Sequence, residues 1–120
     1  MCAITVLKMT CPALLITHRS ITDSVADLIV ARIEIESSAF DDEWEVRCED
    51  RRFANAVIHQ RMMDWLLSQG ATPPRTSFEL HGPWLLAMTE ILGGDDYGVL
   101  LDYLTTFSDK IPPFLSDLYP

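Results

Sequence analysis

The sequence predicts an α+β domain in which a mainly antiparallel sheet carries its helices on one face. Short runs of β-branched or alternating apolar residues indicate strands, and these runs come in pairs separated by turn residues. Stretches with apolar residues every three or four positions indicate a helix after each pair. The order strand, strand, helix therefore recurs three times, and a chain of 120 residues has the usual size of one domain, residues 1–120.

The first unit is predicted to be a hairpin followed by a helix. The runs AITVLKM and ALLITH are apolar and β-branched, and the TCP between them indicates a turn because Pro12 has no amide proton to pair. In the following SITDSVADLIVA, apolar residues recur at helical spacing from Ile21 to Ile29, and Ser20 is placed to cap them. We therefore expect an amphipathic helix after the first hairpin.

The second unit begins with two alternating runs. RIEIES places Ile33 and Ile35 on one face of a strand, with glutamates on the other. WEVRCED likewise places Trp44, Val46 and Cys48 on one face. Two half-buried strands are therefore expected, with SSAFDDE as the connection between them.

The helix of this unit, RRFANAVIHQRMMDWLLSQ at residues 51–69, has more apolar faces than one core can cover. At about 100° per residue, one side gathers Ala54, Ile58, Met62 and Trp65. Nearly the opposite side gathers Phe53, Ala56, Val57, Met63 and Leu67. Either the helix is sandwiched between two layers, or it breaks near His59 and Gln60 so that each half presents one face to the same core.

The third unit follows a loop, SQGATPPRT, in which Gly70 is a natural stop for the preceding helix. SFELHG and PWLLAMTE alternate on either side of Gly82–Pro83, which predicts a hairpin. One face of the first run holds Phe78 and Leu80, and one face of the second holds Trp84, Leu86 and Met88.

The final helix is predicted within GGDDYGVLLDYLTTFSDK, with Asp95 or Asp96 as its N-cap. Its inward stripe is expected at Tyr97, Leu101, Leu104 and either Phe107 or Ser108. The tandem prolines of IPPFLSDLYP then end the helix, and the apolar residues after them are expected to pack against the body.

Composition excludes several classes of partner. The chain has 9 basic and 18 acidic residues, a formal net charge of -9, which repels nucleic acid and anionic lipid surfaces. Its three cysteines, Cys2, Cys11 and Cys48, are an odd number without paired spacing, so reduced thiols in a cytoplasm fit best. No apolar run approaches the length of a membrane span or has the flanks of a signal peptide, so we expect no membrane contact.

No motif identifies a metal site, a cofactor or a catalytic residue. GGDDY and Asp41–Glu43 lack the context of nucleotide and calcium loops, and the histidines are scattered. We expect a non-catalytic protein without metal or cofactor. Two alternatives stay open: a small hydrolase or transferase built on Cys48 and a histidine, and a binder of a small apolar ligand. The site for such a ligand would lie between the sheet and the helices, lined by Trp44, Phe78, Trp84 and Met88.

The excess apolar surface of residues 51–69 favours a protein-interaction domain that binds a protein partner or a second copy of itself. Met and Trp suit adaptable apolar recognition, and arginines among acids can set the orientation of a partner. The expected contact residues are Arg51, Arg52, Arg61, Met62, Met63 and Trp65. If the helix breaks, its own core absorbs much of the excess, and the candidate contact narrows to the RMMDW turn.

The stretch IEIESSAFDDEWEVRCEDRRFANAVIHQRMMDWLL resembles the central signature of an uncharacterised actinobacterial domain family. The matching residues are Glu36, Ser37, Phe40, Val46, Asp50, Phe53, Ala54, Arg61, Met62, Met63, Trp65, Leu66 and Leu67. Weaker matches at Trp84-Leu85 and Ile111-Pro112 extend the likeness to about residues 30 to 115.

Members of that family usually carry this domain beside membrane-spanning segments, and no activity, cofactor or catalytic residue is established for them. The resemblance therefore implies a free-standing soluble copy, encoded by an actinobacterium or by one of its phages. This chain departs from the family at Asp41–Asp42, where an Asn-Arg pair is usual, so an inherited anionic partner is not expected. The family tends to have proline where this chain has Gln60, which favours a helix break there.

Overall fold

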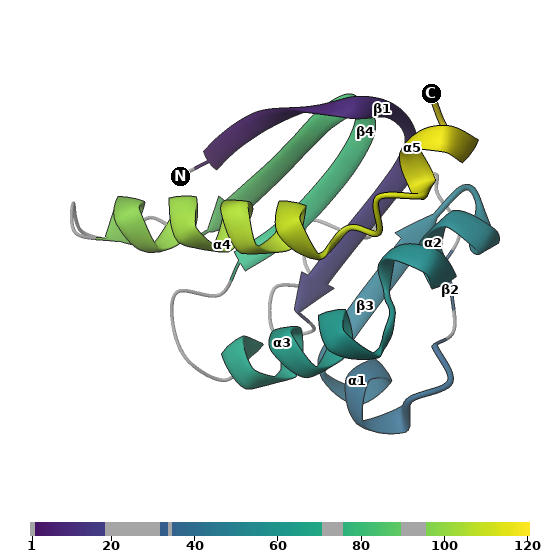
Figure 1. The fold of residues 1–120 in the computed structure, drawn as a ribbon. Helices are drawn as coiled ribbons and strands as arrows, with labels where there is room; N and C mark the ends of the chain where they lie inside the picture. The colour runs from purple at the N-terminus through teal and green to yellow at the C-terminus, as the bar shows by residue number, and fades with distance from the viewer. Residues whose placement is uncertain (1, 19–31, 34, 71–75, 90–95) are drawn as a thin grey trace.

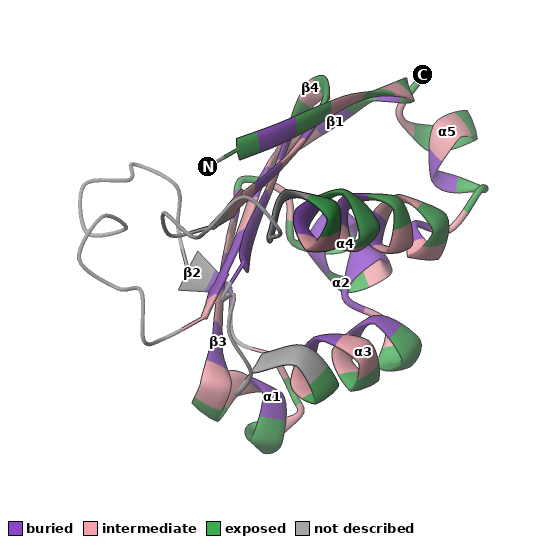
Figure 2. Cartoon of the chain, turned by 90° about the vertical axis from the view of Figure 1, so that its left-hand side faces the viewer, coloured by how far each residue is buried: buried purple, intermediate pink, exposed green. Residues whose placement is uncertain are grey.

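The computed structural model describes residues 2–18, 32–33, 35–70, 76–89 and 96–120. In chain order the elements are β1 (Cys2–His18), β2 (Arg32–Ile33), α1 (Ser38–Glu43), β3 (Trp44–Cys48), α2 (Arg51–Val57), α3 (Gln60–Gly70), β4 (Thr76–Thr89), α4 (Asp96–Lys110) and α5 (Leu115–Leu118). The strands form one antiparallel sheet in the order β2-β3-β1-β4 (Figure 1). Figure 2 shows α2, α3 and α4 on the same side of this sheet, which confirms the predicted α+β class.

The first and third predicted hairpins are wrong, because each pair of predicted strands is one long strand. β1 pairs with β4 from Cys2 opposite Met88 to Ile16 opposite Phe78, with register shifts on either side of Cys11. The two strands arch over together (Figure 1). The turn residues mark where the strands bend and their register shifts, but each strand resumes pairing with the same partner after the bend and does not pair with itself.

The bend also changes which residues of β4 face the core. Before it, Phe78 and Leu80 are buried, whereas after it the buried positions are Leu85 and Ala87. Gly82 lies between them with a φ of 58°, a left-handed conformation that glycine adopts without strain. The predicted grouping of residues by face is therefore confirmed, but the face that carries Trp84 points away from the core.

The second unit forms around β3, whose Trp44, Val46 and Cys48 are buried as predicted. The predicted connection before it is not wholly irregular, since it contains α1, capped by the Ser37 hydroxyl. Phe40 of α1 is fully buried and stacks on Trp44, with ring centroids 6.3 Å apart. The short helix thus completes the core below β3.

The helix predicted at residues 51–69 is broken, as the second alternative required. α2 ends at Val57 and α3 begins at Gln60. α2 buries Phe53, Ala54, Val57 and the adjoining Ile58, and α3 buries Met62 and Leu66. The two apolar faces of the straight helix therefore become one face on each segment, and both pack against the same core.

α4 packs on the sheet through Leu100, Leu104 and Phe107, and Ile111, just after the helix, is also buried. The prediction for Leu101 is wrong, because Leu101 is 40% exposed and the inward stripe lies one residue earlier. The helix ends at Lys110, before the two prolines, and α5 follows with Leu115 buried. The helix predicted over residues 20–31, the Asp95 cap and most of the loop after Gly70 lie outside the described residues.

Tyr119 connects three parts of the fold. Its carbonyl oxygen accepts a hydrogen bond from the Thr10 amide of β1 at 2.7 Å, and its ring lies edge-on to Phe53 of α2. Its hydroxyl donates to Asp50 Oδ2 at 2.8 Å, while Asp50 Oδ1 accepts from the Arg52 and Phe53 amides and caps α2. The hydroxyl of Tyr119 and these amides lower the pKa of Asp50.

Replacing Tyr119 by Phe should therefore lower stability in a pH-dependent way. Because the pKa of Asp50 is lowered in the folded protein, its contribution is present above the unfolded pKa and is lost as the pH falls through the folded pKa. At neutral pH we expect Tyr119→Phe to cost about 1 kcal/mol, measured by urea unfolding. The difference from the wild type should shrink in acid.

The control is the same substitution made in an Asp50→Asn background. Asparagine does not titrate in this range, so the pH-dependent part of the Tyr119→Phe effect should disappear there. A loss of stability that is the same at every pH would contradict the assignment to Asp50.

Candidate functional site

The structure does not bring the predicted contact residues together on one surface. Met62 is fully buried, and Met63 and Trp65 are half-buried against the core. The exposed members are Arg51, Arg52 and Arg61. Met62 is therefore part of the core and is not available to a partner in this fold.

Trp65 is a packing residue between α3, β4 and α4. Its ring lies 5.7 Å from that of Phe78, 6.1 Å from that of Tyr103 and 6.4 Å from that of Phe107, between centroids. Phe78 and Phe107 themselves stack at 4.5 Å. This aromatic cluster holds α3 and α4 against the sheet, so removing Trp65 would disturb folding before it disturbed any contact.

Arg51 and Met63 lie on a shallow groove between α1, α2 and α3. The groove has a volume of about 720 Å³, and it is lined by Ile35, Glu36, Ser37, Ser38, Asp41, Asp42, Arg51, Asn55, Ile58 and Met63. The expected combination of arginine, methionine and surrounding acids thus occurs here, although Arg61 lies elsewhere. Acidic side chains outnumber the arginine, so a basic partner fits this groove better than an acidic one.

The thiols are poorly suited to nucleophilic catalysis. The Cys48 thiol is buried and donates a hydrogen bond to the Asp50 carbonyl at 3.1 Å, and burial raises its pKa. Burial and the nearby Cys48 raise the pKa of Cys11 to about 11. A catalytic cysteine needs the opposite environment, because the thiolate is the reactive species.

The four residues proposed to line an apolar ligand do not share a cavity. Trp44 and Phe78 are buried in the core, beneath the helices. Trp84 is 46% exposed, and it lies with Met88 on the opposite face of the sheet. A single small ligand cannot reach both sets, since the sheet lies between them.

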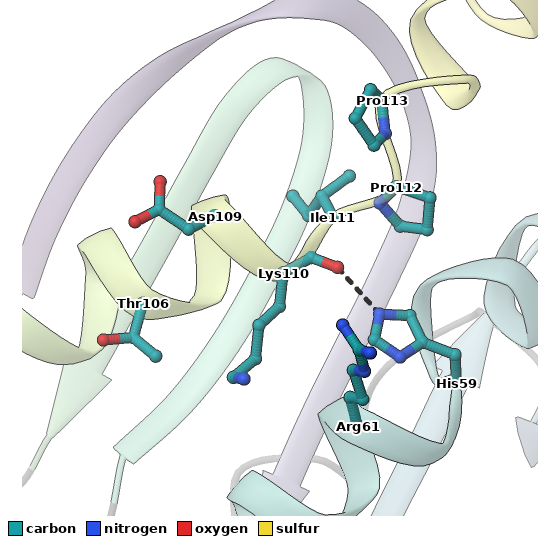
Figure 3. A pocket seen from close by; sticks show the side chains of 8 residues that line it. All are labelled: His59, Arg61, Thr106, Asp109, Lys110, Ile111, Pro112 and Pro113. Carbon is teal, nitrogen blue, oxygen red and sulfur yellow. Dashed lines mark hydrogen bonds between the residues drawn. The ribbon is translucent and has the colours of Figure 1, made fainter.

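His59 joins two helix ends. Its Nε2–H donates to the Lys110 carbonyl at the end of α4 at 2.7 Å (Figure 3), and its Nδ1 accepts from the Met62 amide in the first turn of α3 at 3.2 Å. This pair of bonds fits the neutral tautomer that carries its proton on Nε2. His59 thus caps the start of α3 and satisfies a terminal carbonyl of α4, a role that its residue type does not signal in sequence.

The outer face of the β1–β4 pair is apolar. Three cross-strand pairs lie on it: Cys2 with Met88, Ile4 with Leu86, and Val6 with Trp84. We call these six residues the outer ladder. Val6 is 63% exposed and Ile4 is 56% exposed, whereas the intervening Ala3, Leu85 and Ala87 are buried on the other face. Directly opposite residues of an antiparallel pair share a face, so the ladder is one continuous strip.

Sequence reasoning missed this strip, although its signal is present. AITVLKM has apolar residues at odd and even positions, so a strand built from it exposes some of them unless both faces are covered. The grouping of Trp84, Leu86 and Met88 was predicted, but period-two alternation does not say which face is inward.

No protein family, curated protein or solved structure matches the chain. The likeness to an actinobacterial domain family therefore stays a prediction. Within the described ranges, no cluster of three or more His, Cys, Asp or Glu side chains is arranged to hold a metal ion. In the same part of the chain, no helix combines the length and apolarity that a membrane span requires.

The capping role of His59 can be tested by two substitutions. His59→Ala removes both hydrogen bonds, and we expect the free energy of unfolding to fall by about 2 kcal/mol in urea titrations. His59→Asn keeps an oxygen that can cap α3 but is too short to reach Lys110, so its cost should be about half as large. The neighbouring Gln60→Ala is the control, because the Gln60 side chain donates to the exposed Asp64 and not to either helix end. Equal stability of His59→Ala and Gln60→Ala would contradict this role.

Proposed function

We propose that the protein is a non-catalytic protein-interaction domain, and that it associates with a second copy of itself through the outer ladder. The single observation that supports this is the exposure of Ile4, Val6 and Trp84 side by side on one strip of sheet. Contiguous exposed apolar surface of this kind is costly in water unless another molecule covers it.

The strand order favours a second copy as the partner. β4 is at one end of the described sheet, where its only hydrogen-bonded neighbour is β1. Two β4 strands that pair antiparallel about Leu86 would place Trp84 opposite Met88 of the partner subunit, and Leu86 opposite its counterpart. Such an interface is closed by two-fold symmetry, and the Trp84, Leu86 and Met88 side chains of each copy would be covered by their counterparts along the seam between the two β4 strands.

Charge also favours this site over the rest of the surface. Each copy has a formal net charge of -9, so two copies repel over most orientations. The segment PWLLAM at residues 83–88 contains no charged side chain, and the ladder residues of β1 are also uncharged. The copies can therefore approach here without placing like charges directly opposite each other.

We also propose that the protein is cytoplasmic, and that a different protein can be its partner. The acid-rimmed groove with Arg51 and Met63 is a second surface, and a basic partner would suit it. Cys11 and Cys48 are free and buried, which is compatible with a reducing compartment. A cysteine-dependent hydrolase or transferase is disfavoured because the pKa values of both buried thiols are raised.

Association can be tested with a double substitution on the ladder, Val6→Lys with Trp84→Lys. Both side chains are exposed, so the fold should survive, and lysine also reduces the net negative charge that opposes association. Sedimentation equilibrium should give the mass of a dimer for the wild type. The dissociation constant of the variant dimer should be at least about tenfold higher than that of the wild type, because two apolar contact residues are lost.

The matched control is Leu118→Lys on α5, because Leu118 is 65% exposed and lies outside the ladder. It should associate like the wild type. A wild-type protein that is monomeric at the highest attainable concentration would overturn the proposal, and so would a control that dissociates as readily as the ladder variant.

A further inference from the structure

A second pocket, separate from the outer ladder, lies where α4 ends beside the start of α3 (Figure 3). It has a volume of about 440 Å³, within the range of small-molecule sites. Its lining residues are His59, Arg61, Thr106, Asp109, Lys110, Ile111, Pro112 and Pro113. We call this pocket the α3–α4 slot.

The slot gathers two positive charges in an acidic protein. Arg61 comes from the first turn of α3 and Lys110 from the last turn of α4, and neither has an ion-pair partner among the described residues. Asp109 also lines the slot, but its carboxylate points away from Arg61 and Lys110 (Figure 3). Two cations that share a pocket repel each other unless an anion lies between them.

The backbone positions that carry these two cations are held together by His59. His59 precedes α3 and its ring is bonded to the carbonyl of Lys110 itself, so the two helix ends cannot separate without breaking that 2.7 Å bond. The bond from the Met62 amide holds the other side of the ring. The two helix ends that form the slot are therefore held beside each other before any ligand arrives, which lowers the entropic cost of binding.

We propose that the α3–α4 slot binds a phosphate group, either free phosphate or the phosphate of a small phosphorylated molecule. A phosphate group carries between one and two negative charges at neutral pH, which one arginine and one lysine can balance. The Arg61 guanidinium offers a fork of donors, Lys110 offers a compact charge, and the Thr106 hydroxyl lies one helical turn before Lys110 on α4. These are the donor types that phosphate oxygens accept.

The rest of the slot favours a small ligand over a long polyanion. Ile111, Pro112 and Pro113 form an apolar wall beside the cations, where the carbon part of a phosphate ester would lie. A nucleic acid would instead have to approach a protein with a formal net charge of -9, which repels its phosphates. A single phosphate group needs only the two cations of the slot.

The test is a titration of the folded protein with inorganic phosphate and, separately, with phenyl phosphate, at constant ionic strength set by sodium chloride. Backbone amide NMR shifts should change saturably around residues 59–62 and 106–111. Phenyl phosphate should bind more tightly if the apolar wall contacts the ester, and equally if only free phosphate is recognised. Either result supports the slot and distinguishes the two sources of the phosphate group.

Arg61→Gln and Lys110→Gln should each weaken binding by about tenfold or more, because each removes a charge-assisted contact. Arg52→Gln is the matched control, since Arg52 is an exposed arginine that does not line the slot, and it should change affinity less than about twofold. The amide spectrum of each variant checks its fold.

Absence of saturable shifts at millimolar phosphate would overturn the proposal. An equal loss of binding in Arg52→Gln would also overturn it, because it would show that phosphate responds to overall charge. Neither result bears on self-association, which uses the opposite face of the sheet.

Discussion

β1 and β4 stay paired with each other from Cys2 to Ile16 although both strands bend, and the rest of the fold is arranged around that bend. β1 also pairs with β3, so a single strand carries the register of most of the sheet. Inside the bend, Phe78 stacks on Phe107 of α4 and anchors that helix. Outside it, the change of facing near Gly82 leaves the outer ladder in solvent. The bend of the β1–β4 pair therefore explains both the buried core and the exposed apolar strip.

Polar contacts at helix ends then fix the layer of helices. Asp50 caps α2 and receives the Tyr119 hydroxyl, which ties the C-terminal segment to α2, while the Tyr119 carbonyl ties it to β1. His59 likewise connects α3 to α4, because its ring bonds to the Met62 amide and to the Lys110 carbonyl. Helices this short are marginal alone, so these caps and the packing of their apolar faces must hold them together.

Much of the fold followed from local patterns in the sequence, and the failures have physical reasons. The alternating pattern correctly placed Trp44, Val46 and Cys48 inward. The two apolar faces of residues 51–69 correctly indicated a helix break as one of two alternatives. The predicted hairpins failed because turn residues report a change of chain direction but not the partner of each strand. The prediction that Leu101 faces inward was wrong because Leu100 and Leu101 are adjacent, and the helical pattern does not decide between them.

The candidate sites were harder to predict because they depend on distant contacts. Arg61 and Lys110 share the α3–α4 slot although they are far apart in the chain, and no spacing rule connects them. Met62 and Trp65 are residue types that are common at contact surfaces. In the folded protein, however, Met62 is buried in the core and Trp65 packs in the aromatic cluster. The exposed strip was instead supplied by strands whose outward face could be identified only once the pairing was known.

The central proposal is that two copies of the chain associate through the exposed face of β4 and through its outer edge in the described sheet. The most direct measurement is amide hydrogen exchange of β4 at low and high protein concentration, because a paired edge protects amides that otherwise face water. We predict slower exchange at high concentration, confined to residues 84–88 and the facing part of β1. Exchange that does not depend on concentration, or protection confined to α3, would contradict the account.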